Sequence, residues 1–238
     1  MSTTPQPLTI AIGESERVSA LLQAPAEARA CYVMAHGAGG GMTHAFMTKV
    51  AAELATQGVA TLRFQFPYME RGKKRTDPPK VAHAAVRAAV AEASRRLPDL
   101  ALFAGGRSFG GRMSSQAQAL APLAGVRGLV FLGFPLHPTG KPSIDRAEHL
   151  DEVRIPMLFL QGTNDELADL PLLRSVIARL GTRATLELFE AADHSFHAPA
   201  RTGRNDADIR AAVVAATRKW IDSTIRATAE PAIPGAMR

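Results

Sequence analysis

The chain has 238 residues, of which 46% are hydrophobic, and its 28 Lys and Arg against 22 Asp and Glu give a net charge of +6. This length and composition predict one compact α/β domain with a full core. The basic surplus suggests nucleic acid, but only 5% of the residues are aromatic, too few for a base-stacking surface. We therefore expect no nucleic-acid partner.

The lone cysteine, Cys31, excludes a disulfide within the chain and falls in an apolar run, where a small buried hydrophobe is the expected role. Residues 1–7 lack a basic region followed by an apolar core, and no apolar run approaches the length of a membrane span. We expect a cytoplasmic protein without a signal peptide or a membrane partner.

Hydrophobic periodicity and turn residues predict eight strands, at residues 8–12, 18–23, 30–35, 60–64, 100–104, 128–132, 157–161 and 185–189. Five helices are expected, at residues 46–57, 80–96, 108–120, 170–180 and 206–223. Beyond the two opening strands, strand and helix alternate, which favours a mainly parallel, doubly wound sheet. The ordered core should span about residues 8–223, with a flexible tail at 224–238.

A glycine-rich loop, His36-Gly37-Ala38-Gly39-Gly40-Gly41, follows the strand at 30–35. Glycines let a backbone approach a ligand closely and turn an N–H group toward it. The loop lacks the Lys-Ser/Thr ending of a P-loop and the spacing of a dinucleotide fingerprint, so we expect no nucleotide cofactor. We predict substrate contacts at Gly37 and Gly39, and an oxyanion donor at the Ala38 N–H, with Gly39 as the alternative.

A basic cluster, Arg71-Gly72-Lys73-Lys74-Arg75, follows the strand at 60–64. One interpretation is a solvated loop. The other is a clamp for an anionic substrate, because this loop can lie on the carboxyl edge of the sheet, where ligands bind. On the second interpretation we hypothesise a preference for acidic or phosphorylated acyl substrates.

The run Gly105-Gly106-Arg107-Ser108-Phe109-Gly110-Gly111 lies between a predicted strand and a predicted helix. A strand, a glycine-flanked serine and a helix in this order are the context of a G-x-S-x-G nucleophile elbow. The serine occupies a tight, strained turn, so side chains at positions 106 and 110 would clash. Ser108 is therefore the candidate nucleophile. The Phe109 N–H, at the start of the helix, is a candidate oxyanion donor.

Two arginines flank the candidate nucleophile, and a structural role is the first expectation for both. Arg112 falls four residues after Ser108 on the same helix face. It either binds a substrate carboxylate or fixes the loop around Tyr68 through an ion pair. Arg107 directly precedes Ser108.

The candidate acid is Asp165, which follows the strand at 157–161. Glu166 and Asp169 are rivals, and capping of the next helix is the structural alternative for Asp165. The acid of a triad holds the imidazole of the base in the correct tautomer.

The candidate base is His194, which follows the strand at 185–189, with His197 as its rival. The base would take the Ser108 proton during attack and return it to the leaving group. Serine, acid and histidine thus occur in the order found in α/β-hydrolases.

Four segments together resemble a family of α/β-hydrolases that is distantly similar to dienelactone hydrolases: residues 36–40, 63–68, 105–112 and 133–138. The family includes the bacterial relatives of testis-expressed protein 30 and of a nuclear acetyltransferase-complex subunit. The resemblance covers about residues 8–221 and implies the α/β-hydrolase fold, with a triad of Ser108, Asp165 and His194. Dienelactone hydrolases proper use a cysteine nucleophile, so their lactone chemistry is not carried over.

Lids in this fold usually follow the sixth strand, but residues 133–156 are few, rich in Pro and Gly, and show no pair of amphipathic helices. We expect no substantial lid domain and an open site, which favours a small or soluble ester, thioester or amide over long-chain fats. His137, at a strand end, is a candidate substrate contact, with ordinary packing as the alternative.

Two classes of function follow from these motifs. The first is a serine hydrolase that forms an acyl-enzyme on Ser108 and needs no cofactor or metal. The second is a non-catalytic interaction module that keeps the fold. The complete set of triad residues favours the hydrolase.

Overall fold

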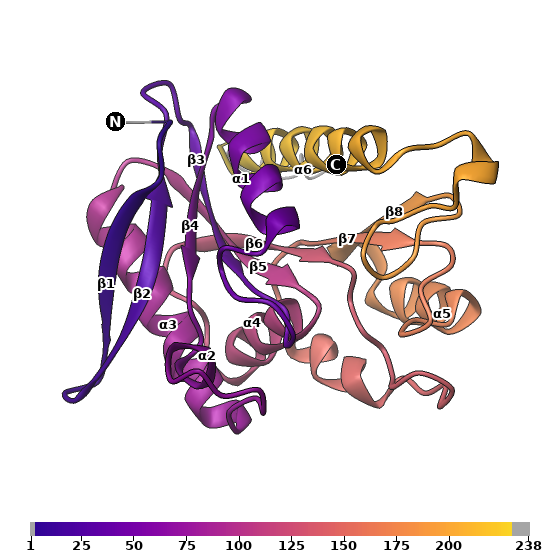
Figure 1. The fold of residues 1–238 in the computed structure, drawn as a ribbon, viewed down its shortest axis with the longest axis horizontal. Helices are drawn as coiled ribbons and strands as arrows, with labels where there is room; N and C mark the ends of the chain where they lie inside the picture. The colour runs from indigo at the N-terminus through magenta and orange to yellow at the C-terminus, as the bar shows by residue number, and fades with distance from the viewer. Residues whose placement is uncertain (1–2, 230–238) are drawn as a thin grey trace, which may run out of the picture.

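A computed structural model of the protein describes residues 3–229. Its eight strands form one sheet in the order β1-β2-β4-β3-β5-β6-β7-β8 (Figure 1). Strand β2 runs antiparallel to both β1 and β4, and every other neighbouring pair is parallel. The predicted sheet of eight mainly parallel strands is confirmed. The strands are β1 (Gln6–Ile12), β2 (Glu16–Gln23), β3 (Ala30–Ala35), β4 (Val59–Phe64), β5 (Ala101–Arg107), β6 (Val126–Leu132), β7 (Met157–Gly162) and β8 (Ala184–Phe189).

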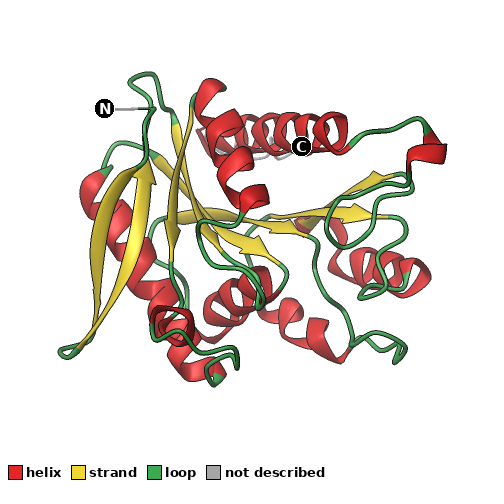
Figure 2. Cartoon of the chain, in the orientation of Figure 1, coloured by secondary structure: helices red, strands yellow, loops and turns green. Residues whose placement is uncertain are grey.

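Helices cover both faces of the sheet (Figure 2). One face carries α1 and α6, whereas α3, α4 and α5 lie on the other (Figure 1). The α-helices are α1 (Ala45–Thr56), α2 (Pro67–Glu70), α3 (Pro79–Arg96), α4 (Phe109–Leu120), α5 (Leu170–Leu180) and α6 (Asp206–Ala229). Three short 3₁₀ helices are η1 (Asp145–Glu152), η2 (Gly181–Arg183) and η3 (Ala200–Thr202).

The central strands supply side chains to two separate cores. In β3, Tyr32 and Met34 pack with α1 and α6, whereas Cys31 and Val33 pack on the opposite face with α3. Successive side chains of a strand point to opposite faces, so a strand covered on both sides is apolar at every position. This burial explains why β3 has no polar residue, and it confirms the expected interior position of Cys31.

The predicted flexible tail at 224–238 is wrong for its first residues, because α6 continues to Ala229. Ile225 packs against the core of that face, and the Thr228 hydroxyl accepts a hydrogen bond of 3.3 Å from Arg127. These contacts extend the helix six residues beyond the expected end at 223. Residues 230–238 lie outside the described part of the chain.

The segment between β6 and β7 contains no inserted domain in the structure. Helix η1, which the sequence did not indicate, packs against α4 and buries Ala147 and Leu150. Within residues 3–229, no helix combines the length and apolar character needed to cross a bilayer.

Candidate active site

Ser108 occupies a strained turn between β5 and α4, as the elbow motif predicts. Its backbone angles are φ 49° and ψ −115°, in a region that non-glycine residues rarely adopt. A Cβ atom at Gly106 would lie 2.0 Å from the Ala35 carbonyl oxygen, and one at Gly110 would lie 2.5 Å from the same atom. Only glycine fits at these two positions, because the elbow presses against the end of β3.

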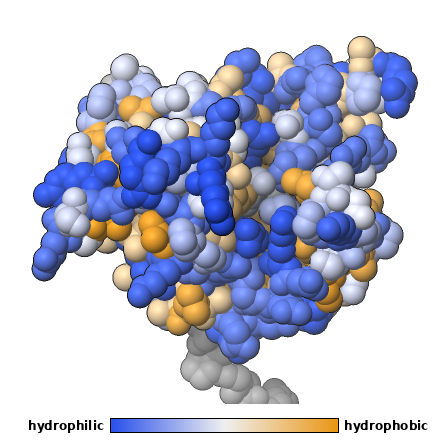
Figure 3. Space-filling view, turned by 60° about the horizontal axis from the view of Figure 1, so that its bottom comes forward, coloured by the Kyte–Doolittle hydropathy of each residue, from blue (hydrophilic) through white to orange (hydrophobic). Residues whose placement is uncertain are grey.

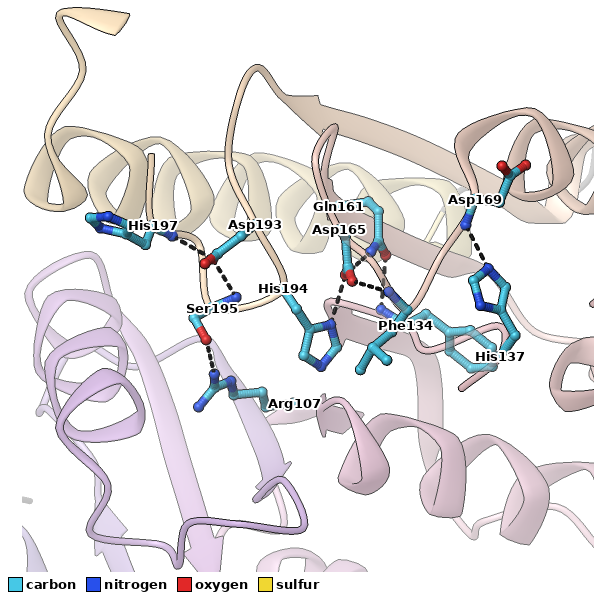
Figure 4. Close-up of polar contacts among 11 residues, drawn as sticks. Arg107, Phe134, His137, Gln161, Asp165, Asp169, Asp193, His194, Ser195 and His197 are labelled. Carbon is cyan, nitrogen blue, oxygen red and sulfur yellow. Dashed lines mark hydrogen bonds and ion pairs between the residues drawn. The ribbon is translucent and has the colours of Figure 1, made fainter. Parts of the chain in front are cut away.

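His194 and Asp165 are joined by a hydrogen bond of 2.7 Å from the imidazole Nδ1 to carboxylate Oδ2 (Figure 4). The Asp165 side chain is completely buried, whereas that of His194 is 21% exposed. Asp165 also accepts hydrogen bonds from the Gln161 side-chain amide and, at 2.8 Å, from the Leu167 N–H. Three donors thus hold the carboxylate in place, and its bond to Nδ1 leaves Nε2 of His194 as the acceptor nitrogen.

The imidazole of His194 lies beside the elbow. The Ser108 N–H donates to the Leu132 carbonyl at 3.2 Å, and a Cβ atom on the next residue, Gly133, would lie 3.3 Å from Nδ1 of His194. Nε2 of His194 is buried and has no hydrogen-bond partner among the described residues. The structure therefore places the imidazole ring of His194 against Gly133, the residue after the backbone partner of Ser108, and shows no hydrogen bond between the His194 and Ser108 side chains.

The rival residues have other roles. Asp169 caps α5 by accepting a hydrogen bond of 3.0 Å from the Leu172 N–H, and Glu166 is exposed. His197 pairs with Asp206 at 2.8 Å on the exposed surface. His137 is 3% exposed and its Nε2 accepts from the Asp169 N–H at 2.9 Å, while Nδ1 contacts the Pro138 carbonyl. With both ring nitrogens bound to backbone, His137 fits the packing alternative.

The two predicted oxyanion donors are the backbone N–H groups of Ala38 and Phe109. The Gly37 carbonyl accepts hydrogen bonds from Nδ1 of His36 at 2.7 Å and from the Tyr68 hydroxyl at 3.4 Å. Because a trans peptide is planar, the Ala38 N–H points away from both side chains. Neither this N–H nor that of Phe109 has a hydrogen-bond partner in the described part of the chain.

The two peptides on either side of Ala38 are supported by the buried polar side chains of His36 and Tyr68. Nε2 of His36 accepts a hydrogen bond of 2.9 Å from the Phe66 N–H, so the proton resides on Nδ1. Burial lowers the pKa of His36 to about 4, which keeps the ring neutral at pH 7. The Tyr68 hydroxyl donates to the Ala38 carbonyl at 2.9 Å, and burial, followed by the charge of Asp77, raises the pKa of Tyr68 to about 12.

A model of the alpha/beta hydrolase domain family matches residues 28–222. The chain belongs to this family. Among solved structures, it is similar to a dienelactone hydrolase from Anabaena variabilis, with 21% identity, a TM-score of 0.73, and 92% of this chain and 98% of the other covered. It is also similar to a serine hydrolase without a lid from Xanthomonas campestris, with 22% identity, a TM-score of 0.71, and 92% and 96% covered. For a serine hydrolase homologue from Coxiella burnetii, the identity is 19%, the TM-score is 0.71, and the match covers 90% of this chain and 97% of the other. At these identities the structural matches establish the fold, and the predicted α/β-hydrolase fold is confirmed.

The basic loop of this α/β-hydrolase is partly neutralised by ion pairs. Arg71 pairs with Glu16 and, at 2.6 Å, with Asp77, whose carboxylate also accepts from the Tyr68 N–H. The remaining basic side chains are exposed, and Lys73 and Arg75 line a surface hollow of about 570 Å³ that includes no residue of the elbow. These contacts favour the interpretation as a solvated loop.

Arg112 makes no ion pair with the Tyr68 loop. Its guanidinium carbon lies 5.9 Å from the centre of the Phe109 ring, and its buried Nε has no hydrogen-bond partner among the described residues. Burial, followed by the positive charge of Arg146, lowers the pKa of Arg112. The alternative in which Arg112 fixes the Tyr68 loop through an ion pair is not observed, because Asp77 holds that segment. Within residues 3–229, the Arg112 guanidinium has no carboxylate partner, one helical turn from Ser108.

Within residues 3–229, the protein exposes few large apolar side chains. On the face turned forward in Figure 3, hydrophilic residues predominate and hydrophobic ones form small, separate groups. Leu120 is the single large hydrophobic residue counted as exposed within residues 3–229. In the same range, no cluster of three or more His, Cys, Asp and Glu side chains suits a metal ion.

Several supporting residues were not found from the sequence. Gln161 joins the ends of two strands, since its amide donates to Asp165 and its carbonyl oxygen accepts from the Phe134 N–H at 2.9 Å (Figure 4). The polar character of Gln161 at the end of an otherwise apolar strand was the available signal. Tyr68 was noted only as a loop residue, because its contact with Ala38 joins distant parts of the chain.

Proposed function

We propose that this protein is a serine hydrolase that cleaves a small or soluble ester, thioester or amide through an acyl-enzyme on Ser108. The observation that carries the proposal is the hydrogen bond from His194 to Asp165, on an imidazole whose opposite nitrogen is unpartnered among the described residues and whose ring lies against Gly133, the residue after the backbone partner of the strained Ser108. A strained, non-glycine turn is costly to maintain and recurs where a side chain must be presented to a reactant.

The proposed reaction begins when Ser108 Oγ attacks the acyl carbon and Nε2 of His194 takes the hydroxyl proton. The tetrahedral oxyanion receives hydrogen bonds from the Ala38 N–H of the glycine-rich loop and the Phe109 N–H of the elbow. Protonated His194 gives the proton to the leaving group, and Asp165 stabilises the imidazolium. Water then attacks the ester of Ser108, with His194 as base, and releases the acid. None of these steps needs a metal or a cofactor.

Labelling with a fluorophosphonate probe tests this assignment directly. We expect stoichiometric modification of Ser108 in the wild type, none in Ser108→Ala, and labelling slowed about a hundredfold or more in His194→Ala, because general-base catalysis contributes that much. Ser94→Ala, which removes an exposed serine on α3, is the matched control and should react like the wild type. Absence of wild-type labelling would favour the non-catalytic interaction module.

The substrate class is proposed from the polarity of the surface and from the segment between β6 and β7. A hydrophilic face with scattered apolar residues, and no inserted lid between β6 and β7, favours short acyl chains over lipid (Figure 3). We expect kcat/KM to fall from p-nitrophenyl acetate and butyrate to the octanoate. A preference for the octanoate contradicts this proposal without affecting the assignment of Ser108.

An anionic substrate remains part of the proposal, with Arg112 as its partner in place of the basic loop. Arg112 has an unpartnered buried Nε, whereas Arg71 is already bound to two carboxylates. We expect Arg112→Gln to raise KM for the p-nitrophenyl monoester of succinate but not for the neutral butyrate ester. Equal turnover of both esters by the wild type, independent of salt, excludes the preference.

We also propose a closer family relation within the α/β-hydrolases and a location in the cell, both from the sequence. Residues 36–40, 63–68, 105–112 and 133–138 support a relation to the bacterial relatives of testis-expressed protein 30 and of the acetyltransferase-complex subunit. A cytoplasmic location fits the single buried cysteine. Fractionation of cells that produce the protein tests the location.

A further inference from the structure

Arg107 connects the two loops that carry the candidate nucleophile and base. Its Nη2 donates a hydrogen bond of 3.0 Å to Ser195 Oγ (Figure 4). Arg107 directly precedes Ser108, and Ser195 directly follows His194. One hydrogen bond between side chains therefore joins the immediate neighbours of the two groups between which a proton must pass.

A second contact holds the same loop through aromatic rings. The guanidinium carbon of Arg107 lies 5.4 Å from the centre of the Phe46 ring, which stacks on Phe196 with centroids 5.4 Å apart and planes 4° apart. Phe196 has φ 60°, which is unfavourable for a bulky residue, so packing must offset backbone strain. Arg107 thus contacts the loop after His194 directly at Ser195 and indirectly through Phe46.

An ordinary surface role does not account for Arg107. The side chain is half-buried and has a buried Nε without a hydrogen-bond partner among the described residues. The charges of Asp193 and Asp165 act on it, but neither carboxylate forms an ion pair with it there. Removing a guanidinium from water without a carboxylate partner costs free energy. A function that needs the His194 loop at a fixed distance from Ser108 would account for this cost.

We propose that Arg107 is a positioning residue that sets the distance between His194 and Ser108 through its hydrogen bond to Ser195. The inference rests on the proposed hydrolase function. A general base works when it can reach about 3 Å from the hydroxyl that it deprotonates, and a displacement of about 1 Å can cost on the order of a hundredfold in rate. The hydrogen bond to Ser195 is the contact through which Arg107 restrains the loop that carries His194.

The test is a double-mutant cycle measured on p-nitrophenyl acetate, a neutral ester that offers no anion to Arg107. We expect Arg107→Gln to lower kcat about tenfold or more, and Ser195→Ala about threefold or more, each with KM within about twofold of the wild type. The double variant should be no slower than Arg107→Gln alone, because both substitutions break the same hydrogen bond. Ser195 is exposed, so its truncation tests the contact even if Arg107→Gln folds poorly.

Arg87→Gln is the matched control. Arg87 is another partly buried arginine, and it donates to the Ala121 and Pro122 carbonyls, just beyond the C-terminal end of α4. Its loss should lower the melting temperature and leave kcat unchanged. Wild-type kcat in Ser195→Ala, additive losses, or an effect confined to KM would each overturn the role of Arg107. Because fluorophosphonate labelling of Ser108 is scored separately, failure of this inference is distinguishable from failure of the hydrolase assignment.

Discussion

The serine side and the histidine side of the candidate site are held in different ways. On the serine side, the turn at Ser108 is fixed by backbone packing, because Gly106 and Gly110 lie against the end of β3 with no room for a Cβ atom. On the histidine side, the base of the loop after β8 is also tightly packed, since a Cβ atom at Gly162 would lie 2.2 Å from the Ala192 carbonyl oxygen. Beyond Ala192, hydrogen bonds restrain the loop, among them one of 2.8 Å from the Asp193 N–H to the His197 carbonyl. Asp193 accepts from the N–H groups of Ser195 at 2.7 Å and His197 at 2.9 Å.

This difference indicates how each side responds to substitution. Backbone packing has no slack, so a single methyl group on the serine side should disrupt the fold. A loop restrained by a few hydrogen bonds should tolerate substitution but lose the placement of His194, and with it activity. Stability measurements therefore probe the first region, and kinetics probe the second.

The largest expected effect is that of Gly110→Ala. The new Cβ atom would lie 2.5–2.6 Å from backbone atoms of Ala35 and His36, which cannot move without disturbing β3. We expect a loss of more than about 4 kcal/mol in the free energy of unfolding, measured by urea denaturation. Gly39→Ala, whose Cβ atom would meet nothing within 4 Å, should lose less than about 1 kcal/mol. Equal free energies of unfolding for the two variants would contradict the view that close backbone packing fixes the turn at Ser108.

The same contrast explains what the sequence could predict. The elbow was predictable because its determinants are contiguous: a strand, Gly106, Ser108, Gly110 and a helix. Strand positions were likewise predictable near the middle of the sheet, since β3, β4 and β7 are buried at every position and most of their side chains are apolar.

The remaining determinants join residues far apart in the chain. Arg107 is 88 positions from Ser195, and Tyr68 is 30 positions from Ala38. No local pattern encodes such contacts. The structural roles of Asp169 and His137 were obscured for the same reason, because the hydrogen bond between them forms only after β6 and α5 have packed.

The next largest effect is expected for Asp165→Asn. The amide preserves the shape of the buried side chain but no longer stabilises the imidazolium of His194, so kcat should fall about a thousandfold, or about 4 kcal/mol in activation free energy. Asp169→Asn is the control: asparagine caps helices as well as aspartate does, so both kcat and stability should stay close to wild type. Equal kcat values in the two variants, measured on p-nitrophenyl acetate, would identify a different acid.

A third effect is the dependence of stability on pH, which we expect to involve a histidine that packs against α4 on the serine side. Nε2 of His149 on η1 lies 2.7 Å from the Ser115 hydroxyl on α4. Burial, followed by the charges of Arg112 and His83, lowers the pKa of His149 from 6.5 to about 4. Between these values the unfolded chain binds a proton that the folded protein excludes. The stability contribution is therefore complete above about pH 6.5 and decreases as the pH falls toward 4.

We therefore expect His149→Gln to lose about 2 to 3 kcal/mol less stability than the wild type on acidification from pH 7.5 to 4.5. Urea denaturation at both pH values measures this difference. Parallel losses in the two proteins would show that His149 is not kept neutral by the fold.

The smallest effect is expected from the two tyrosines, which form a matched pair. Tyr68→Phe removes the hydroxyl that binds the Gly37 and Ala38 carbonyls, whereas Tyr32→Phe removes a buried hydroxyl that donates to Val130 at 2.9 Å within the other core. Each loss should cost about 1 kcal/mol of stability. Only Tyr68→Phe should also lower kcat, by about tenfold, because the Ala38 N–H then loses its fixed direction toward the oxyanion. Equal kcat values for the two variants would mean that the neighbouring His36 orients this peptide without help from Tyr68.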